Sequence, residues 1–184
     1  MLLNFQQSII DLTGMDIANA SLLDEATATA EAVGLSQRLD KTNSKKIFIS
    51  NNCNPQTIDL IKTRTNPFGL ELIIGDEKKE LTKISDDIIC GVLSYPGTLG
   101  EINDPSESIS LIHKKNGKAI LVCDLLALAR LKTPAELGAD IAVGSAQRFG
   151  IPMGYGGPHA AFFATKEEFK RSMPGRIIGV SKDR

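Results

Sequence analysis

The sequence is poor in several features that mark particular functional classes. It has no tryptophan, and aromatic residues make up 5% of its 184 positions, so it offers few side chains on which nucleic-acid bases could stack. The formal net charge is −1, which gives no general attraction to nucleic acid or to an anionic membrane. No segment approaches the roughly 20 consecutive apolar residues of a membrane span. The composition therefore predicts a globular protein that binds neither nucleic acid nor membrane.

Cysteine and histidine are also scarce. The chain has three cysteines, Cys53, Cys90 and Cys123, an odd number without C-x-x-C spacing, which argues against a disulfide framework and a zinc site. Two of them lie in apolar runs, so we expect buried thiols in a reducing compartment. His113, in a polar H-K-K-N-G stretch, is expected to be solvated. It and His159 have no metal-ligand companions at useful spacing, so no metal site is predicted.

What is present is an alternation of short apolar runs with helical segments. Continuous rather than alternating apolar runs are typical of strands covered on both faces. They occupy residues 47–49, 72–74, 88–93, 119–123, 141–143 and 160–164. Helices are expected from Pro55 to the residue before Pro67, and from Pro105 to Asn116-Gly117. Strands that alternate with helices predict an α/β protein with three α/β/α layers and a mostly parallel sheet.

The amino-terminal part reads as helical. Apolar residues recur at helical spacing from Leu2 to Leu12, and Gly14 ends this helix. A second helix is expected from Ser21, with Asp24 and Glu25 resembling a capping box. We interpret residues 1–184 as a single partial domain, with helices over 1–40 and an α/β core over 46–184. The stretch K-E-E-F-K-R, from Lys166, is expected to be an exposed helix with i,i+4 ion pairs.

Polar residues follow several of the predicted strands, where parallel sheets place their sites. One of them is Asp124, after the strand A-I-L-V-C. In the aspartate-aminotransferase-like (fold-type I) enzymes, an aspartate at such a strand end pairs with the pyridine nitrogen of pyridoxal phosphate and keeps the ring protonated. The alternative is an aspartate that caps the following helical turn, and the sequence leaves both open.

A longer match gives the family. The segment from Gly138 to His159, G-A-D-I-A-V-G-S-A-Q-R-F-G-I-P-M-G-Y-G-G-P-H, resembles the glycine cleavage system P-protein family almost residue for residue. So do L-L-N-F-Q near the start and K-R-S-M-P-G-R-I-I-G-V-S-K-D near the end. Family members contain a half that carries pyridoxal phosphate on a lysine and a degenerate half that does not. The chain resembles part of the degenerate half, an incomplete large domain.

The resemblance implies that this portion has no catalytic residue. Alignment with the active half places Gln147 at the position of the lysine, and an amide nitrogen cannot form an imine. The neighbouring Arg148 stays protonated and cannot replace that lysine. In the loop that includes Thr98, Leu99 stands where the active half has a histidine that stacks on the pyridine ring. Gln147 and Leu99 therefore both indicate that this chain binds no cofactor.

The same comparison concerns the helix near Ser21, which corresponds to the region that holds the cofactor phosphate in the active half. Free N–H groups at a helix start attract anions. Asp24 and Glu25 would satisfy those groups and repel a phosphate, although an ordinary helix cap explains them equally well. We therefore interpret Asp124, Leu99, Thr98, Asp24 and Glu25 as a relic pocket. Asp124 is expected to have acquired a new structural partner there.

The glycine-rich loop P-M-G-Y-G-G-P-H lacks the spacing of a dinucleotide or phosphate loop. We interpret it as a tight turn with close backbone packing. Alternatively it contacts the other half of the enzyme, with Tyr155 and His159, together with Arg148, as interface candidates. Asn54 stands where the family typically has a histidine, which leaves the role of that histidine open.

The resemblance implies a portion of a glycine dehydrogenase (decarboxylating) that forms structure and an interface. Its expected partners are the catalytic half of the P-protein and, in the complete enzyme, the lipoyl arm of the H-protein. Pyridoxal phosphate would be bound only in the complete enzyme. Because the chain is several times shorter than family proteins, we expect a truncated gene, an incomplete reading frame or a cut fragment, prone to self-association. The location is expected to be cytoplasmic, or the mitochondrial matrix in a eukaryote.

Two alternatives remain open on the sequence alone. One is an autonomous pyridoxal-phosphate enzyme in which another lysine, such as Lys166 or Lys46, reaches Asp124. The other is a non-functional truncated module.

Overall fold

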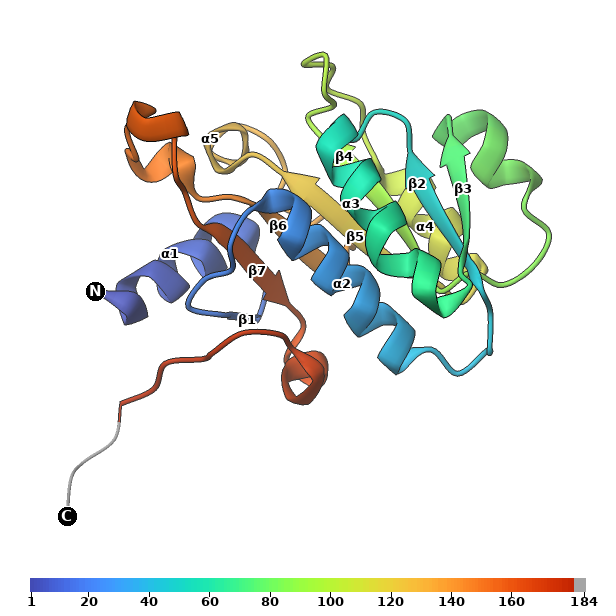
Figure 1. The fold of residues 1–184 in the computed structure, drawn as a ribbon, viewed down its shortest axis with the longest axis horizontal. Coiled ribbons are helices and arrows are strands. Elements are labelled where there is room, and N and C mark those ends of the chain that lie inside the picture. The colour runs from blue at the N-terminus through green and yellow to red at the C-terminus, as the bar shows by residue number, and fades with distance from the viewer. Residues whose placement is uncertain (181–184) are drawn as a thin grey trace.

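The computed structural model describes residues 1–180; the last residues of the carboxyl-terminal family motif, 181–184, lie outside the described part. Its centre is a seven-stranded sheet in the order β1-β7-β6-β5-β4-β2-β3 (Figure 1). The strands are β1 (Ile17–Ala18), β2 (Lys46–Ser50), β3 (Glu71–Gly75), β4 (Cys90–Tyr95), β5 (Lys118–Cys123), β6 (Ile141–Ser145) and β7 (Ala161–Thr165).

The prediction of a mostly parallel sheet is confirmed. Strands β2 to β6 are mutually parallel, whereas β7 pairs antiparallel with β6 and β1 pairs antiparallel with β7. All six predicted strands are present, with ends shifted by one or two residues in most cases. The prediction missed β1, which lies within the stretch expected to be helical, because two residues are too few to show a strand pattern.

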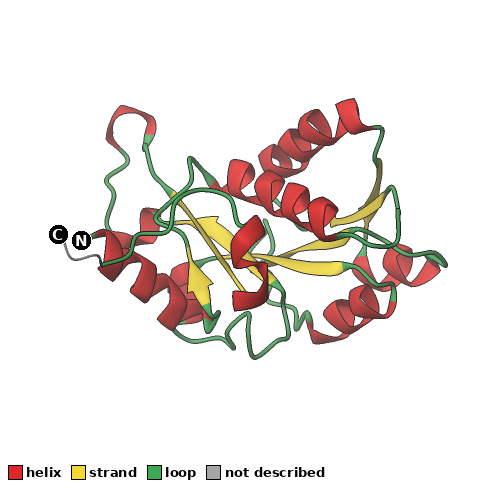
Figure 2. Ribbon diagram, turned by 90° about the horizontal axis from the view of Figure 1, so that it is seen from below, coloured by secondary structure: helices red, strands yellow, loops and turns green. Residues whose placement is uncertain are grey.

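Helices cover both faces of the sheet, so the three-layer prediction is also confirmed (Figures 1 and 2). The helices α2 and α3 pack on one face, and α1, α4 and α5 pack on the other. Their bounds are α1 (Leu2–Thr13), α2 (Glu25–Leu39), α3 (Pro55–Thr65), α4 (Ser106–Lys114) and α5 (Leu125–Leu128). Short 3-10 turns occupy Asn66–Phe68, Gln147–Phe149, Gly154–Gly156 and Glu167–Ser172, and Glu77–Leu81 forms a π-helical turn.

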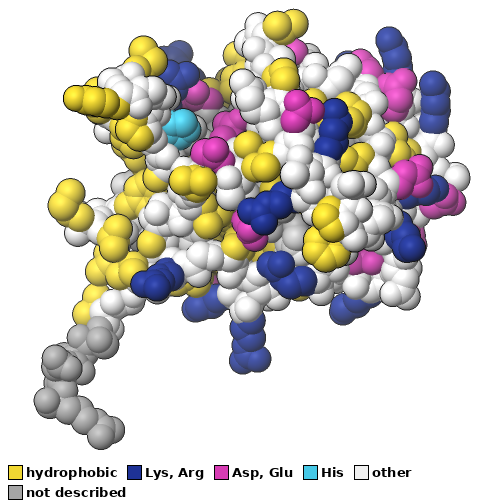
Figure 3. All heavy atoms as spheres, viewed as in Figure 1, with side chains coloured by type: hydrophobic (Ala, Val, Ile, Leu, Met, Phe, Trp, Pro, Cys, Tyr) yellow, Lys and Arg dark blue, Asp and Glu magenta, His cyan; other side chains and the backbone are white. Residues whose placement is uncertain are grey.

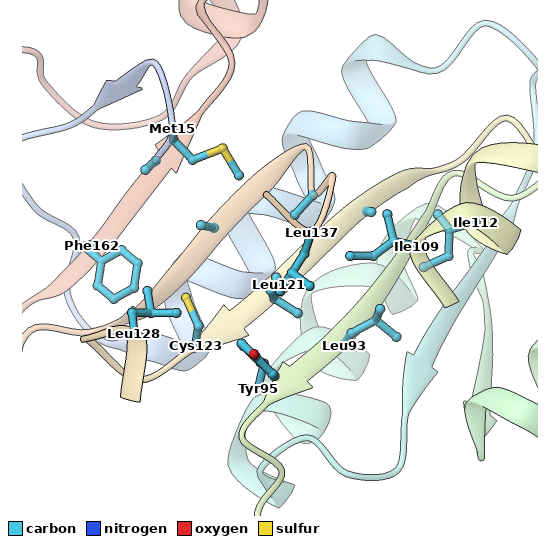
Figure 4. Close-up of a cluster of buried hydrophobic side chains, with 14 of the residues drawn as sticks. Met15, Leu93, Tyr95, Ile109, Ile112, Leu121, Cys123, Leu128, Leu137 and Phe162 are labelled. Carbon is cyan, nitrogen blue, oxygen red and sulfur yellow. The ribbon is translucent and has the colours of Figure 1, made fainter. Parts of the chain in front are cut away.

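Alternate residues of each strand point to opposite faces and fill two hydrophobic clusters. In β5, Leu121 belongs to the cluster under α1, α4 and α5, whereas Ile120 and Val122 face α2. Figure 4 shows the first cluster, where Leu121 lies among side chains from α4 and β4, including Ile109 and Leu93. Because both faces are covered, every position of β5 after Lys118 is buried, which explains its continuous apolar sequence.

The first two helices show how local sequence sets their ends. Helix α1 ends as predicted, because Gly14 adopts a left-handed conformation with φ 69° and its N–H bonds to the carbonyl of Ile10. The predicted start of α2 at Ser21 is wrong. Asp24 caps this helix by accepting a 2.7 Å hydrogen bond from the N–H of Thr27, while Leu22 still pairs with Ala161 beside the sheet.

The segment K-E-E-F-K-R also differs from its prediction. The segment forms 3-10 turns over Glu167–Ser172, and its ion pair joins Lys170 to Glu167 at i,i+3 rather than i,i+4. Phe169 is buried there, and the ammonium of Lys118 lies 5.3 Å from the centre of its ring. Glu167, Glu168, Lys170 and Arg171 are exposed as expected, and the buried Phe169 anchors the segment.

A strap formed by residues 174–178 runs along the outer edge of the sheet. Its carbonyls accept hydrogen bonds from the side chain of Asn19 and the N–H of Ala20, next to β1. Further along, the amide of Gln6 on α1 both donates to the carbonyl of Ile178 and accepts from its N–H, at 3.1 and 2.8 Å. The strap thus satisfies polar groups that an open edge would expose.

The three cysteines are free and buried; burial was predicted for Cys90 and Cys123, and Cys53 is buried as well. Burial raises the pKa of all three thiols, because the ionised form would lose its hydration. We therefore expect the native chain to react very slowly with a disulfide-forming thiol reagent at neutral pH. In denaturant, all three thiols should react, so each chain should consume three equivalents of the reagent. Rapid labelling of the native protein would contradict the burial of the thiols.

Within residues 1–180, no helix combines the length and apolar character needed to cross a bilayer.

Candidate functional site

A cleft of about 270 Å³ lies at the carboxyl ends of β4 and β5, the edge of the sheet at which the sequence places its site. Ser94 and the loop 96–100 form one wall, and Val122 to Asp124 form the floor. The start of α2 and the residue before α3 contribute Glu25 and Asn54. Arg148, from the 3-10 turn after β6, completes the lining.

Asp124 has two sets of partners in this cleft. One carboxylate oxygen accepts hydrogen bonds from the N–H groups of Leu126 and Ala127, so Asp124 caps α5. The other oxygen accepts a 2.8 Å hydrogen bond from Nε of Arg148. The capping interpretation therefore holds in the structure, and the side chain that faces the carboxylate from across the cleft is a guanidinium.

Glu25 and Thr98 are joined through Asn54. The amide nitrogen of Asn54 donates to Oε1 of Glu25 at 2.8 Å, and its carbonyl oxygen accepts from the hydroxyl of Thr98 at 2.6 Å. Burial raises the pKa of the Glu25 carboxyl, and the nearby carboxylate of Asp124 raises it further, against the opposing effect of hydrogen bonds from Asn54 and Thr57. Asn54, whose role the sequence left open, thus links Glu25 to Thr98.

Other residues of the predicted relic pocket lie elsewhere. Asp24 is occupied as the cap of α2 and does not line the cleft. Leu99 is 89% exposed at the tip of the loop 97–101. Gln147 lies in the turn after β6, where its N–H bonds to the hydroxyl of Ser145, and its side chain is outside the cleft lining. The structure therefore brings together Asp124, Thr98 and Glu25 but not Leu99 or Asp24.

The glycine-rich loop projects beside the cleft. It forms tight turns, with left-handed backbone at Tyr155, Gly156 and Gly157. The expected close packing is absent at Gly154 and Gly156, where an added Cβ would meet nothing within 4 Å. Tyr155 is fully exposed, and Nδ1 of the partly buried His159 lies 2.8 Å from the carbonyl of Gly157.

Exposed apolar side chains surround this loop. Leu126, Phe149 and Met153 are 64%, 48% and 83% exposed, respectively. Hydrophobic atoms gather at the upper left of Figure 3, where the loop 147–158 projects in Figure 1. The ring of Phe149 also makes an edge contact with Phe5 on α1, with centroids 5.9 Å apart. The carboxyl edge of the sheet thus carries an apolar rim next to a polar cleft.

Both alternative lysines lie at the amino ends of the parallel strands, on the side of the sheet opposite the cleft. Lys46 begins β2 and pairs with Asp86 on the surface. Lys166 follows the antiparallel strand β7 and therefore emerges at the amino ends of the parallel strands, where its ammonium lies 2.5 Å from Asp140. Neither lysine can reach Asp124 without unfolding the sheet, since the strands themselves separate the two edges.

Asp140 is a buried carboxylate at the centre of a cluster with the partly exposed His113 and Lys166, which the sequence did not predict. The carboxylate is 5% exposed and accepts from the N–H of Ala119 and from Lys166, and it lies 2.8 Å from Nε2 of His113. The expectation that His113 is solvated agrees with its 40% exposed side chain, but its contact with Asp140 was not expected. The signal was an acidic residue directly before the apolar run 141–143.

The chemistry open to the cleft follows from its lining. Its described residues supply two carboxylates, a guanidinium, an amide and hydroxyls, and no lysine. No cluster of three or more His, Cys, Asp or Glu side chains that could hold a metal ion occurs within residues 1–180. The described residues of the cleft do not fit pyridoxal phosphate, because none of them is a lysine that could form the imine and Arg148 occupies the Asp124 carboxylate.

Comparison with known proteins agrees with this architecture. The family model for the glycine cleavage system P-protein matches residues 1–184. The chain is 77% identical over its full length to a glycine dehydrogenase (decarboxylating) of Pelagibacter ubique, and 55% identical over 99% of its length to that of Stutzerimonas stutzeri. In both cases it covers only 19% of the relative, so the chain spans about a fifth of the length of these proteins.

Solved structures give the same result at the level of the fold. A crystal structure of the glycine decarboxylase (P-protein) of the glycine cleavage system, in inhibitor-bound form, matches 99% of this chain with a TM-score of 0.90 and 34% identity, covering 42% of that protein. A cystathionine gamma lyase (CalE6) of Micromonospora echinospora matches 92% with a TM-score of 0.68 at 12% identity, covering 44% of that chain, and shares only the fold. The architecture is that of the fold-type I pyridoxal-phosphate enzymes, and the chain belongs to the P-protein family of the glycine cleavage system.

Proposed function

We propose that the chain is a portion of a glycine dehydrogenase (decarboxylating) that serves as scaffold and interface rather than as a catalyst. The observation that carries the proposal is the cleft at Asp124. Its carboxylate is held by Arg148, and no lysine among residues 1–180 lines the cleft. A pyridoxal-phosphate enzyme needs a lysine that can lose its proton at this edge of the sheet.

In this proposal, the reaction is carried out by the complete enzyme and not by this portion. It decarboxylates glycine with pyridoxal phosphate and passes the aminomethyl group to the lipoyl arm of the H-protein. The cofactor and its lysine belong to the catalytic half, the partner of this portion, in the cytoplasm or, in a eukaryote, the mitochondrial matrix. Relatives with the name glycine dehydrogenase (decarboxylating) support this assignment.

The apolar rim around the cleft supports the interface role. Met153, Tyr155 and Phe149 project from a loop that buries little of its own surface. Exposed apolar and aromatic side chains of this kind are typical of surfaces that a partner covers. We propose that the catalytic half covers the loop 147–158, with Tyr155, His159 and Arg148 close to the contact. Without that partner, the same surface favours self-association.

The proposed lack of cofactor chemistry predicts the outcome of a labelling experiment. The purified chain is mixed with pyridoxal phosphate, its absorbance is recorded, and the mixture is reduced with borohydride and mapped by peptide mass spectrometry. We expect only dispersed, low-level adducts on exposed lysines, because no lysine of the described part of the chain lines the cleft at Asp124. The heat-unfolded chain serves as the control and should show the same dispersed pattern.

A stoichiometric, borohydride-stable adduct at one lysine of the folded chain, lost on unfolding, would contradict the proposal. Lys46 and Lys166 are the sites to inspect first, and their positions at the far edge of the sheet predict that neither is selected.

A further inference from the structure

Of the two carboxylates in the cleft, one has a cationic partner and the other has none in the part of the chain that the structure describes. Asp124 has a cationic partner in Arg148, whereas the hydrogen-bond partners of Glu25, Asn54 and Thr57, are neutral. Among residues 1–180, no lysine, arginine or histidine nitrogen lies within ion-pair distance of the Glu25 carboxylate. A partly buried carboxylate without a cation is costly, so the Glu25 side of the cleft is suited to a positively charged group.

The opposite side of the cleft has the complementary property. Only the Nε nitrogen of Arg148 is engaged by Asp124, and in the described part of the chain its two terminal nitrogens have no acceptor. The side chain is 57% exposed at the rim, so an incoming carboxylate could bind these nitrogens without displacing Asp124. The cleft therefore presents an acceptor for a cation and a donor for an anion in a single space of about 270 Å³.

We propose that this cleft binds a small zwitterion, a molecule with one ammonium and one carboxylate group, with the ammonium at Glu25 and the carboxylate at Arg148. The three charged side chains carry a net charge of −1 when both carboxylates are ionised, so the cleft disfavours a phosphate and requires the cationic group. Hydroxyls of Thr98 and Ser94 line the same wall and can accept further ammonium hydrogens.

This inference does not depend on the proposed function, because the cleft could bind a zwitterion whether or not any half of the enzyme carries pyridoxal phosphate. It gives the cleft at the carboxyl ends of the strands a ligand whose chemistry differs from that of pyridoxal phosphate. Since Asp124 already caps α5, ligand binding would add contacts without altering the fold around it.

The test is a titration of the isotope-labelled 184-residue chain, followed by amide chemical shifts, with glycine as the smallest amino-acid zwitterion. We expect saturable shifts confined to the segments around Glu25, Asn54, Asp124 and Arg148. Methylammonium and acetate, which each carry one of the two charges, should bind at least about tenfold more weakly, since one charge-assisted hydrogen bond is lost in each case.

Two variants assign the contacts. Glu25→Gln preserves shape but removes the acceptor charge, and Arg148→Gln removes the guanidinium; each should weaken glycine binding about tenfold or more. Arg64→Gln, in the exposed 3.8 Å ion pair with Glu31 on the groove between α2 and α3, is the matched control and should bind glycine normally.

The absence of saturable shifts in the wild-type chain would overturn the inference. So would equal affinity for methylammonium and glycine, or unchanged binding by a folded Glu25→Gln variant. The dispersed amide spectrum of each variant, measured before ligand is added, separates loss of binding from loss of the fold. None of these outcomes affects the pyridoxal-phosphate labelling result.

Discussion

Replacement of Gly144 by alanine is expected to destabilise the chain by about 3 kcal/mol, because the added methyl group has no space in β6. A Cβ at this position would lie 2.2 Å from the carbonyl oxygen of Cys123 and 2.7 Å from the ring of Phe162. The first contact is with the backbone of β5, which cannot move without disturbing the sheet. Thermal unfolding should show a midpoint lower by roughly 6 to 12 °C.

Gly154→Ala is the control for this experiment. No atom lies within 4 Å of a Cβ built at Gly154, so the substitution should change the free energy of unfolding by no more than about 0.5 kcal/mol. Equal unfolding midpoints for the two variants would show that the approach of β5 to β6 at Gly144 is not as close as described.

The second large effect is expected at Asp140. Burial alone would raise the pKa of this carboxyl, but hydrogen bonds from His113, Lys166 and the N–H of Ala119 outweigh that effect and lower the pKa to about 2. Asp140→Asn removes the charge while leaving Lys166 and the backbone donor in place, which should cost about 3 kcal/mol of stability by denaturant unfolding.

The pH dependence of stability gives an independent measurement. Because the folded pKa of about 2 lies below the ordinary value of 3.8, the ionised Asp140 contributes stability above pH 3.8 and loses it as the pH falls toward 2. The size of the contribution is about 2 kcal/mol. The Asp140→Asn variant should not show this part of the stability loss between pH 3.8 and pH 2.

Asp86→Asn is the matched control, because Asp86 forms an exposed, solvent-screened ion pair with Lys46 and its loss should leave the stability nearly unchanged. If Asp140→Asn were as stable as Asp86→Asn at neutral pH, the cluster around Asp140 would have no structural importance.

Much of the fold could be predicted because strands buried on both faces leave a direct signature. The runs that became β2 to β7 are continuous and apolar, and the helices between them begin or end at Pro55, Pro105 and Gly14. Strand β1 could not be predicted, since its pairing partner Thr165 lies about 150 positions away and two residues show no periodicity. The start of α2 was missed for a related reason: the pairing of Leu22 with Ala161 holds Ser21 outside the helix.

The site was predictable in position but not in its connections. The carboxyl ends of the strands identified Asp124 and the loop around Thr98, and both line the cleft. The link from Thr98 through Asn54 to Glu25 depends on how α2 and α3 approach each other, which no local pattern encodes. The same holds for the contact between Asp140 and His113, where side chains 27 positions apart meet only after β5 has paired with β6.

The pairing of β1 with β7 has a consequence for the order of folding. Ile17 is synthesised early, but its neighbour Thr165 emerges from the ribosome only near the end of the described chain. Helix α1 and β1 must therefore wait, with their apolar side chains uncovered, while the central parallel strands assemble without them. Joining such distant segments carries a loop-closure cost and slows folding. Among the described elements, α1 and β1 are thus translated first and completed last, which leaves their apolar side chains exposed to aggregation in the meantime.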